Sequence, residues 1–123
     1  MKLLLDTHVA LWWLAGEPVS EEAERQLGDP TNRVLLSAAV VWEIAIKRSL
    51  GKLEAPSDLV ETLTGAGAAP TPITLEHAAM VEQLPHHHSD PFDRLLVAQA
   101  TVEQAAIVSA DPELRGYDVP VVW

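Results

Sequence analysis

Cysteine is absent from this sequence of 123 residues, and long apolar runs are absent too. Without cysteine the chain forms no disulfides and offers no thiolate to a metal, which fits a reducing compartment such as the cytoplasm. No stretch reaches the about 18 uncharged apolar residues that would predict a membrane span. Asp6 and His8 interrupt the apolar N-terminus, which argues against a signal peptide. The length predicts a single domain over residues 1–123 that buries its own core.

Cations are also scarce: eight Lys and Arg stand against eighteen Asp and Glu, and the net charge is −10. A protein that holds nucleic acid by neutralising many phosphates needs the opposite balance. An enzyme acting on a phosphate ester needs only local positive charge. Metal ions or the cations at Lys47, Arg48 and Lys52 would supply it, and a basic partner would suit the acidic surface.

Short apolar runs alternate with longer helical patterns along the chain. The runs predict strands at 3–5, 34–36, near Ile73, at 106–109 and at 119–122. The intervening patterns predict helices at 7–14, 20–27, 37–50, 59–63, 74–84 and 91–104. Repeated strand–helix units of this kind predict an α/β fold, a three-layer α/β/α sandwich around a mostly parallel sheet of about five strands.

Four carboxylates occur among apolar residues: Asp6 after a leucine run, Glu43 inside an apolar helix, Asp93 in a Pro-Phe-Asp-Arg segment, and Asp111 after the run at 106–110. An ionised carboxylate in such surroundings is costly unless positive charge compensates it. Ligand sites in parallel sheets lie beyond the carboxyl ends of the strands, where Asp6 and Asp111 are expected. If the fold gathers these acids, a hard divalent cation bound through oxygen is the simplest compensation.

Each acid also has a structural interpretation. Asp6 and Asp111 suit the N-cap of a following helix, and Asp111 precedes a proline as such caps often do. Asp90 can cap the next helix, with Asp93 at its favourable third position. Glu43 can pair with Lys47 four residues later. All of these interpretations must hold at once to remove the case for a metal site.

Histidines and tryptophans leave further alternatives open. His86, His87 and His88 are consecutive and point in different directions, so a solvated loop is favoured over a zinc site. His8 lies either near the acids or in ordinary packing. The tryptophans favour a core or a dimer interface over base stacking. They are Trp12, Trp13, Trp42 and Trp123. The apolar helix at 37–50 also favours a subunit interface.

Four segments together resemble the PIN-domain family, and in particular the VapC-type toxins of bacterial toxin–antitoxin pairs. The resemblance spans nearly the whole chain. It rests on Leu5-Asp6-Thr7-His8, on Val41-Trp42-Glu43-Ile44-Ala45-Ile46-Lys47 with Leu50-Gly51-Lys52-Leu53, on His88 through Asp90-Pro91-Phe92-Asp93-Arg94 to Ala100, and on Ser109-Ala110-Asp111 through Tyr117 to Trp123.

The resemblance implies roles for these side chains. The catalytic acids would be Asp6, Glu43, Asp93 and Asp111, with Thr7 and Ser109 as accompanying hydroxyls and Asp90 as either a cap or an outer ligand. The implied cofactor is Mg²⁺, with Mn²⁺ as a substitute. Asp6 and Asp93 would bind the ion directly, and Glu43 and Asp111 directly or through water.

The function so implied is that of a Mg²⁺-dependent endoribonuclease toxin, which cleaves RNA phosphodiester bonds with metal-activated water. Arg94 and Arg115 would contact RNA phosphates, or else form surface ion pairs. The implied partners are a VapB-like antitoxin, in a toxin–antitoxin hetero-oligomer, and a second copy of the chain. The alternatives are a PIN-type nuclease on structured RNA or DNA without a toxin role, and a catalytically silent binding module. A flavodoxin-like receiver domain leaves Glu43 unexplained.

Overall fold

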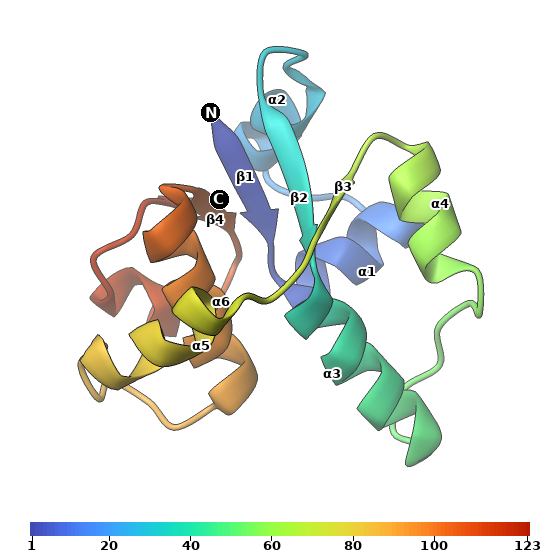
Figure 1. The fold of residues 1–123 in the computed structure, drawn as a ribbon. Helices are drawn as coiled ribbons and strands as arrows, with labels where there is room; N and C mark the ends of the chain where they lie inside the picture. The colour runs from blue at the N-terminus through green and yellow to red at the C-terminus, as the bar shows by residue number, and fades with distance from the viewer.

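A five-stranded sheet forms the centre of the computed structural model, which describes residues 1–123 (Figure 1). All neighbouring strands pair in parallel, in the order β3-β2-β1-β4-β5. The prediction of a mostly parallel sheet is confirmed, and the sheet is parallel throughout. The strands are β1 (Lys2–Leu5), β2 (Arg33–Ser37), β3 (Ala69–Thr71), β4 (Ala106–Val108) and β5 (Val121–Val122).

Helices cover both faces of this sheet. Helices α5 and α6 lie on one face and α1 and α4 on the other, while α3 packs against both α1 and α6 (Figure 1). The predicted three-layer sandwich is therefore confirmed. The helices are α1 (Thr7–Ala15), α2 (Glu21–Gly28), α3 (Ala38–Ser49), α4 (Leu59–Gly65), α5 (Leu75–Met80) and α6 (Pro91–Glu103), with short 3₁₀ helices η1 (Val81–Gln83) and η2 (Pro112–Gly116). None of the helices combines the length and apolar character needed to cross a bilayer.

Strand β1 occupies the middle of the sheet. Leu3, Leu4 and Leu5 have no exposed surface, because helices cover both faces and neighbouring strands cover both edges. Burying each leucine contributes about 1.5–3 kcal/mol to folding. The register sets Leu5 opposite Val108 of β4. The residues that follow the two strands, Asp6 and Ser109, therefore leave the sheet side by side.

The two predicted elements nearest Pro72 differ from those observed. The edge strand is Ala69–Thr71 rather than a strand near Ile73, because Pro70 is tolerated at a sheet edge and Pro72 follows directly. The helix predicted at 74–84 ends at Met80 and continues as η1, ahead of Pro85.

Candidate functional site

Asp6 begins helix α1 directly after the central strand. One oxygen, Oδ1, accepts the backbone N–H of Val9 at 2.8 Å and so caps the helix. The other, Oδ2, accepts a short hydrogen bond from the hydroxyl of Ser109. The residue is only 5% exposed. The cap proposed from sequence is present, and it occupies only half of the carboxylate.

Asp111 approaches the same place from β4. The hydroxyl of Ser109 accepts the backbone N–H of Asp111 at 3.0 Å, so one serine links the segments that follow β1 and β4. Asp111 also caps η2 by accepting the N–H of Glu113 at 2.9 Å through Oδ1. Its second oxygen makes no hydrogen bond.

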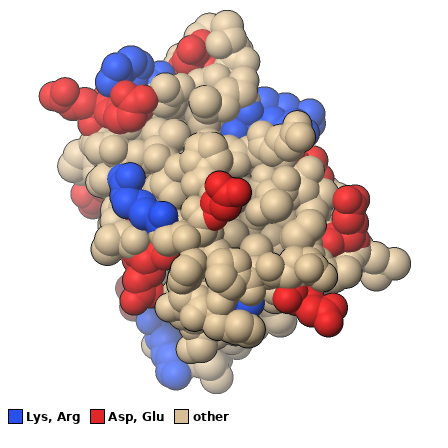
Figure 2. Space-filling model, turned by 90° about the vertical axis from the view of Figure 1, so that its left-hand side faces the viewer, with Lys and Arg blue, Asp and Glu red and all other residues tan.

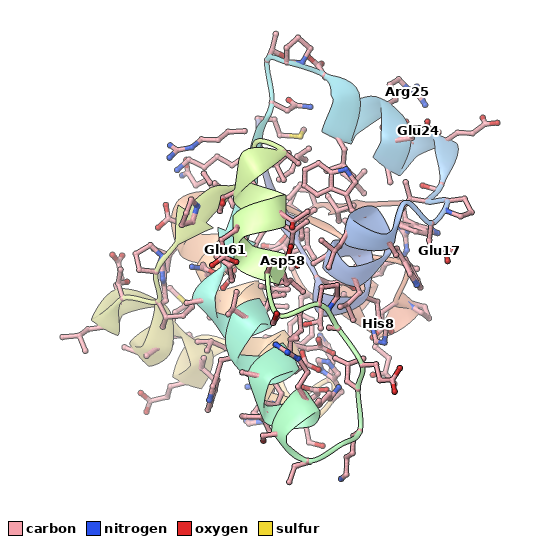
Figure 3. All side chains as sticks on the ribbon, turned by 90° about the vertical axis from the view of Figure 1, so that its right-hand side faces the viewer. His8, Glu17, Glu24, Arg25, Asp58 and Glu61 are labelled. Atoms are coloured by element: carbon pink, nitrogen blue, oxygen red, sulfur yellow. The ribbon has the colours of Figure 1, made fainter.

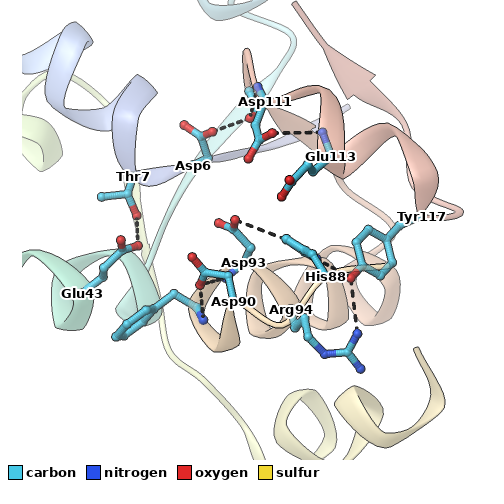
Figure 4. A network of polar contacts seen from close by, with 12 residues as sticks. Asp6, Thr7, Glu43, His88, Asp90, Asp93, Arg94, Asp111, Glu113 and Tyr117 are labelled. Carbon is cyan, nitrogen blue, oxygen red and sulfur yellow. Dashed lines mark hydrogen bonds and ion pairs between the residues drawn. The ribbon is translucent and has the colours of Figure 1, made fainter. Parts of the chain in front are cut away.

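Asp90 and Asp93 lie at the start of α6. Asp90 is the N-cap and accepts the N–H groups of Phe92 and Asp93 at 2.9 and 3.2 Å, with Pro91 at the first helical position. Asp93 follows one turn later and leaves its carboxylate free of any capping bond. Figure 4 shows Asp93 pointing toward Asp6 and Asp111 across a shared space, with Asp90 beside it.

Asp6, Asp93 and Asp111 form a cluster of acids in which burial and mutual repulsion disfavour the charged carboxylates. Burial raises the pKa of Asp6, although the Ser109 and Val9 hydrogen bonds oppose the change, and Asp111 raises it further. Burial, Asp90 and Asp111 raise the pKa of Asp93 to about 6, against an opposing effect of His88. No Lys or Arg makes an ion pair with any member of the cluster. A cation from solution would compensate this charge.

Glu43 lies beside the cluster rather than within it. The hydroxyl of Thr7 donates to Oε1 at 2.6 Å, and Lys47 contacts Oε2 at 2.6 Å (Figure 4 shows the Thr7 contact). The ion pair with Lys47 considered from sequence is thus present. Glu43 is 5% exposed, so the pair is partly desolvated. The hydrogen bond of Glu43 and Lys47, and the charges of Asp90 and Asp93, raise the pKa of Lys47, which places this cation near the acids.

The donor set of the cluster fits a hard divalent cation. It offers carboxylate oxygens, with the hydroxyl of Ser109 beside them, and burial disfavours the charged form of Asp6 and Asp93 until a positive charge is present. No three His, Asp or Glu side chains stand at ligand spacing. Mg²⁺ does not require three such side chains, because it commonly keeps several waters and binds through one or two carboxylates.

Arg94 occupies a different place from the one predicted. It is 8% exposed, and its guanidinium donates to the carbonyl oxygens of Pro85 at 2.8 Å and Val81 at 3.3 Å, as well as to the hydroxyl of Tyr117 at 3.3 Å. Contact with substrate phosphates would require Arg94 to leave these acceptors, and its predicted substrate role stays a prediction. Adjacent helical residues point about 100° apart, so Asp93 faces the cluster while Arg94 faces η1.

His88 was overlooked among the three consecutive histidines. His86 and His87 are exposed as expected for a loop, but His88 is half-buried and contacts both Asp93 and Tyr117. Its only sequence signal is its position five residues before Asp93. Arg115 is exposed on η2 near Asp111, where its predicted phosphate contact stays a prediction. His8 is exposed and close enough to Asp6 to lower its pKa slightly against the effect of burial.

The tryptophans divide between packing and surface. Trp12 stacks at a tilt on Trp123 with ring centroids 5.6 Å apart, and both border the core. Trp42 remains 56% exposed and meets Phe92 edge-on at 5.1 Å.

Charged side chains on the face around α5 and α6 are scattered among uncharged ones, without a continuous basic patch (Figure 2).

Comparison with known proteins agrees with this architecture. The chain is 28% identical to Ribonuclease VapC22 of Mycobacterium tuberculosis (strain ATCC 25618 / H37Rv), with 98% of each sequence covered. It also resembles a chain of VapBC2 from Rickettsia felis bound to a promoter DNA fragment, with TM-score 0.74, 15% identity, and 98% and 97% coverage of this chain and that one. A chain of DNA-bound VapBC from Salmonella typhimurium is similar with a TM-score of 0.72 and 16% identity, with 98% of this chain and 96% of that chain covered.

At such low identities the similarity to solved structures supports the fold alone. The family model described as PIN domain, however, matches residues 3–120, which is nearly the whole chain and includes Asp6, Asp93 and Asp111. The chain therefore belongs to the PIN-domain family.

Proposed function

We propose that this protein is a Mg²⁺-dependent endoribonuclease and the toxin of a VapBC-type toxin–antitoxin pair. The observation that carries the proposal is the meeting of Asp6, Asp93 and Asp111 at one end of the sheet, where burial and repulsion raise the pKa values of Asp6 and Asp93. The name of the relative Ribonuclease VapC22 supports RNA as the substrate, and the VapBC complexes among similar structures support an antitoxin partner.

In this proposal Asp6 and Asp93 hold the ion, and Asp111 and Glu43 act directly or through bound water. The ion would supply a water activated for attack and positive charge for the phosphate in the transition state. Ser109 fixes the orientation of Asp6, and Thr7 fixes that of Glu43. The positive N-terminal ends of α1 and α6 also face the acids and favour bound negative charge.

The deciding experiment replaces Asp6 with Asn, which keeps the shape and removes the charge. Asp6→Asn is expected to reduce Mg²⁺-dependent cleavage of RNA by at least about 100-fold, and to abolish the rise in melting temperature that Mn²⁺ gives the native protein. Asp29→Asn is the matched control, because Asp29 also accepts local hydrogen bonds but is exposed and far along the chain from the cluster.

Full activity of Asp6→Asn would refute the assignment. Cleavage of DNA but not RNA by the native protein would favour the alternative of a PIN-type nuclease without a toxin role. Absence of both cleavage and Mn²⁺ binding would favour a silent binding module.

An antitoxin segment has a suitable groove between α1 and α2. This groove has a volume of about 420 Å³ and combines apolar Trp13, Val19 and Leu27 with acidic Glu17 and Glu24. Figure 3 shows Glu17, Glu24, Asp58 and Glu61 spread over the face formed by α1, α2 and α4. A peptide with apolar and basic side chains complements both properties. We therefore place the antitoxin on this face.

A second copy of the chain suits another groove, beside the edge strand β3. It measures about 430 Å³ and contains no charged residue; Val41, Trp42, Ala45, Val60 and Pro70 are among its lining residues. With a net charge of −10, two copies repel each other unless they meet through uncharged surface. We therefore assign this groove, rather than the acidic one, to the homodimer.

A further inference from the structure

A chain of hydrogen bonds reaches Asp93 from the interior of the protein, and it begins at Arg94. The guanidinium of Arg94 is buried against the carbonyls of Pro85 and Val81 and donates to the hydroxyl oxygen of Tyr117 at 3.3 Å. Arginine has no acceptor and keeps its charge in proteins. The direction of this first bond is therefore fixed, and Tyr117 must be its acceptor.

Tyr117 passes this direction on to His88. Its hydroxyl oxygen lies 2.7 Å from Nδ1 of His88. Nδ1 is the only acceptor that the structure places beside the hydroxyl proton of buried Tyr117, so we assign this proton to the bond with Nδ1, which is then the unprotonated ring nitrogen. The ring proton of the neutral imidazole is thereby assigned to Nε2.

The protonated nitrogen of His88 faces the acid cluster. Nε2 lies 3.4 Å from Oδ2 of Asp93, and the histidine side chain is 10% exposed while that of Asp93 is 25% exposed. Asp93 has no other side-chain hydrogen bond and caps nothing, so this contact is the one polar restraint on its carboxylate. Without it, no hydrogen bond would fix the orientation of the Asp93 carboxylate.

The same chain of bonds joins two acid-bearing segments. Asp93 belongs to α6, whereas Tyr117 closes η2, the element that Asp111 begins. Tyr117 is 4% exposed, and its backbone N–H donates to Leu114, whose own N–H donates to Asp111 at 3.3 Å. The position of Asp93 is thus tied to the segment that carries Asp111.

We propose that His88 is a positioning residue, held in one tautomer by Tyr117 and Arg94, which aims the carboxylate of Asp93 at the bound cation. This inference rests on the proposed role of Asp93 as a metal ligand. Hydrogen-bonded partners of metal ligands commonly contribute a factor of about 10–100 in metal affinity.

The test compares substitutions at His88 by the Kd of Mn²⁺, measured by calorimetry on the metal-free protein. His88→Ala is expected to raise the Kd by about 10-fold or more. His88→Gln is expected to stay within about 3-fold of the native protein, because its amide again places an acceptor and a donor side by side. His87→Ala is the matched control: His87 packs edge-on against the same Tyr117 ring at 4.9 Å without a hydrogen bond, and its removal should leave the Kd unchanged.

A second variant covers the case in which His88→Ala fails to fold. Tyr117→Phe keeps the buried ring and removes only the hydroxyl that fixes the tautomer, so it should weaken Mn²⁺ binding by about 3-fold. Combined with His88→Ala, it should add nothing further, because both changes break one chain of bonds.

The possible results are distinct. Native Mn²⁺ affinity in both His88→Ala and Tyr117→Phe would overturn the positioning role while leaving the proposed nuclease intact. A folded His88→Gln as weak as His88→Ala would overturn it as well, since the hydrogen bonds would then not be the cause. If the native protein itself binds no Mn²⁺, the proposed function falls and the inference falls with it.

Discussion

Individual aspartates in this protein serve two purposes because a carboxylate has two oxygens. Asp6 caps α1 with Oδ1 and receives Ser109 on Oδ2, and Asp111 caps η2 with one oxygen and leaves the other free. The structural and the functional interpretations of these acids are therefore compatible. A cap orients the side chain, and this orientation is what a metal ligand requires.

The partly buried carboxylate of Asp93 has a stability cost that depends on pH. Its folded pKa of about 6 lies above the unfolded value of 3.8, so the native state binds its proton more tightly. The contribution of Asp93 to the free energy of unfolding is therefore highest below about pH 4, falls as the pH rises, and levels off above about pH 6. Asp93→Asn is expected to stabilise the metal-free protein at pH 7.5 by about 1–2 kcal/mol, allowing for its partial exposure, and by almost nothing at pH 4.

Denaturant unfolding in the presence of a chelator, at both pH values, measures this difference. Asp58→Asn is the comparison, since Asp58 is an exposed acid that makes no side-chain capping bond. An equal gain at both pH values would show that charge is not the reason.

The positions of Asp6 and Asp111 in the fold were predictable from sequence, whereas those of their neighbours were not. Asp6 and Asp111 follow buried strands, and a charge at such a point is visible in the pattern of residues. Arg94 is held by a carbonyl of η1 and by Tyr117, which lies more than 20 residues away in the sequence. His88 is held by the same tyrosine. Contacts between such distant segments depend on packing, which residue spacing does not encode.

The ends of two helices offer a matched comparison. Both α1 and α6 end in a left-handed residue, Gly16 with φ 70° and Gln104 with φ 54°. This conformation costs a non-glycine residue about 1 kcal/mol, partly offset by the entropy that glycine loses on folding. Gln104→Gly is therefore expected to stabilise the protein by about 0.5 kcal/mol, measured as a rise in melting temperature.

Gly16→Ala tests the same reasoning in reverse. No atom lies within 4 Å of a Cβ at Gly16, so any loss of stability there comes from the backbone alone. A rise in melting temperature in Gly16→Ala, or a fall in Gln104→Gly, would refute the explanation.

Secondary structure was predictable where several signals coincide. Strand β1 is an uninterrupted leucine run, and α3 and α6 have both a polar cap and a long apolar pattern. The prediction was wrong near Pro70 and Pro72, because two prolines permit pairing of Ala69–Thr71 at the edge and then end it. Which side of a proline pairs depends on the neighbouring strand β2, and this cannot be read locally.

The uncharged groove beside β3 leads to a prediction about assembly. Trp42→Glu places a charge in the lining of this groove and is expected to convert a dimer into a monomer, as measured by light scattering after size exclusion. Leu75→Glu is the control, because Leu75 is 90% exposed yet does not line the groove. A native protein that is monomeric at high concentration, or a dimeric Trp42→Glu, would contradict the assignment.

The order of strands in the sheet also bears on how the protein is made. Central β1 is synthesised first, but one of its two neighbours is β4, about a hundred residues later in the chain. Asp6 therefore meets Ser109 and Asp111 only after β4 has left the ribosome and inserted beside β1. Such distant pairing is a slow step in folding. If the protein cleaves RNA as proposed, an unfinished chain is harmless to the messenger from which it is being translated.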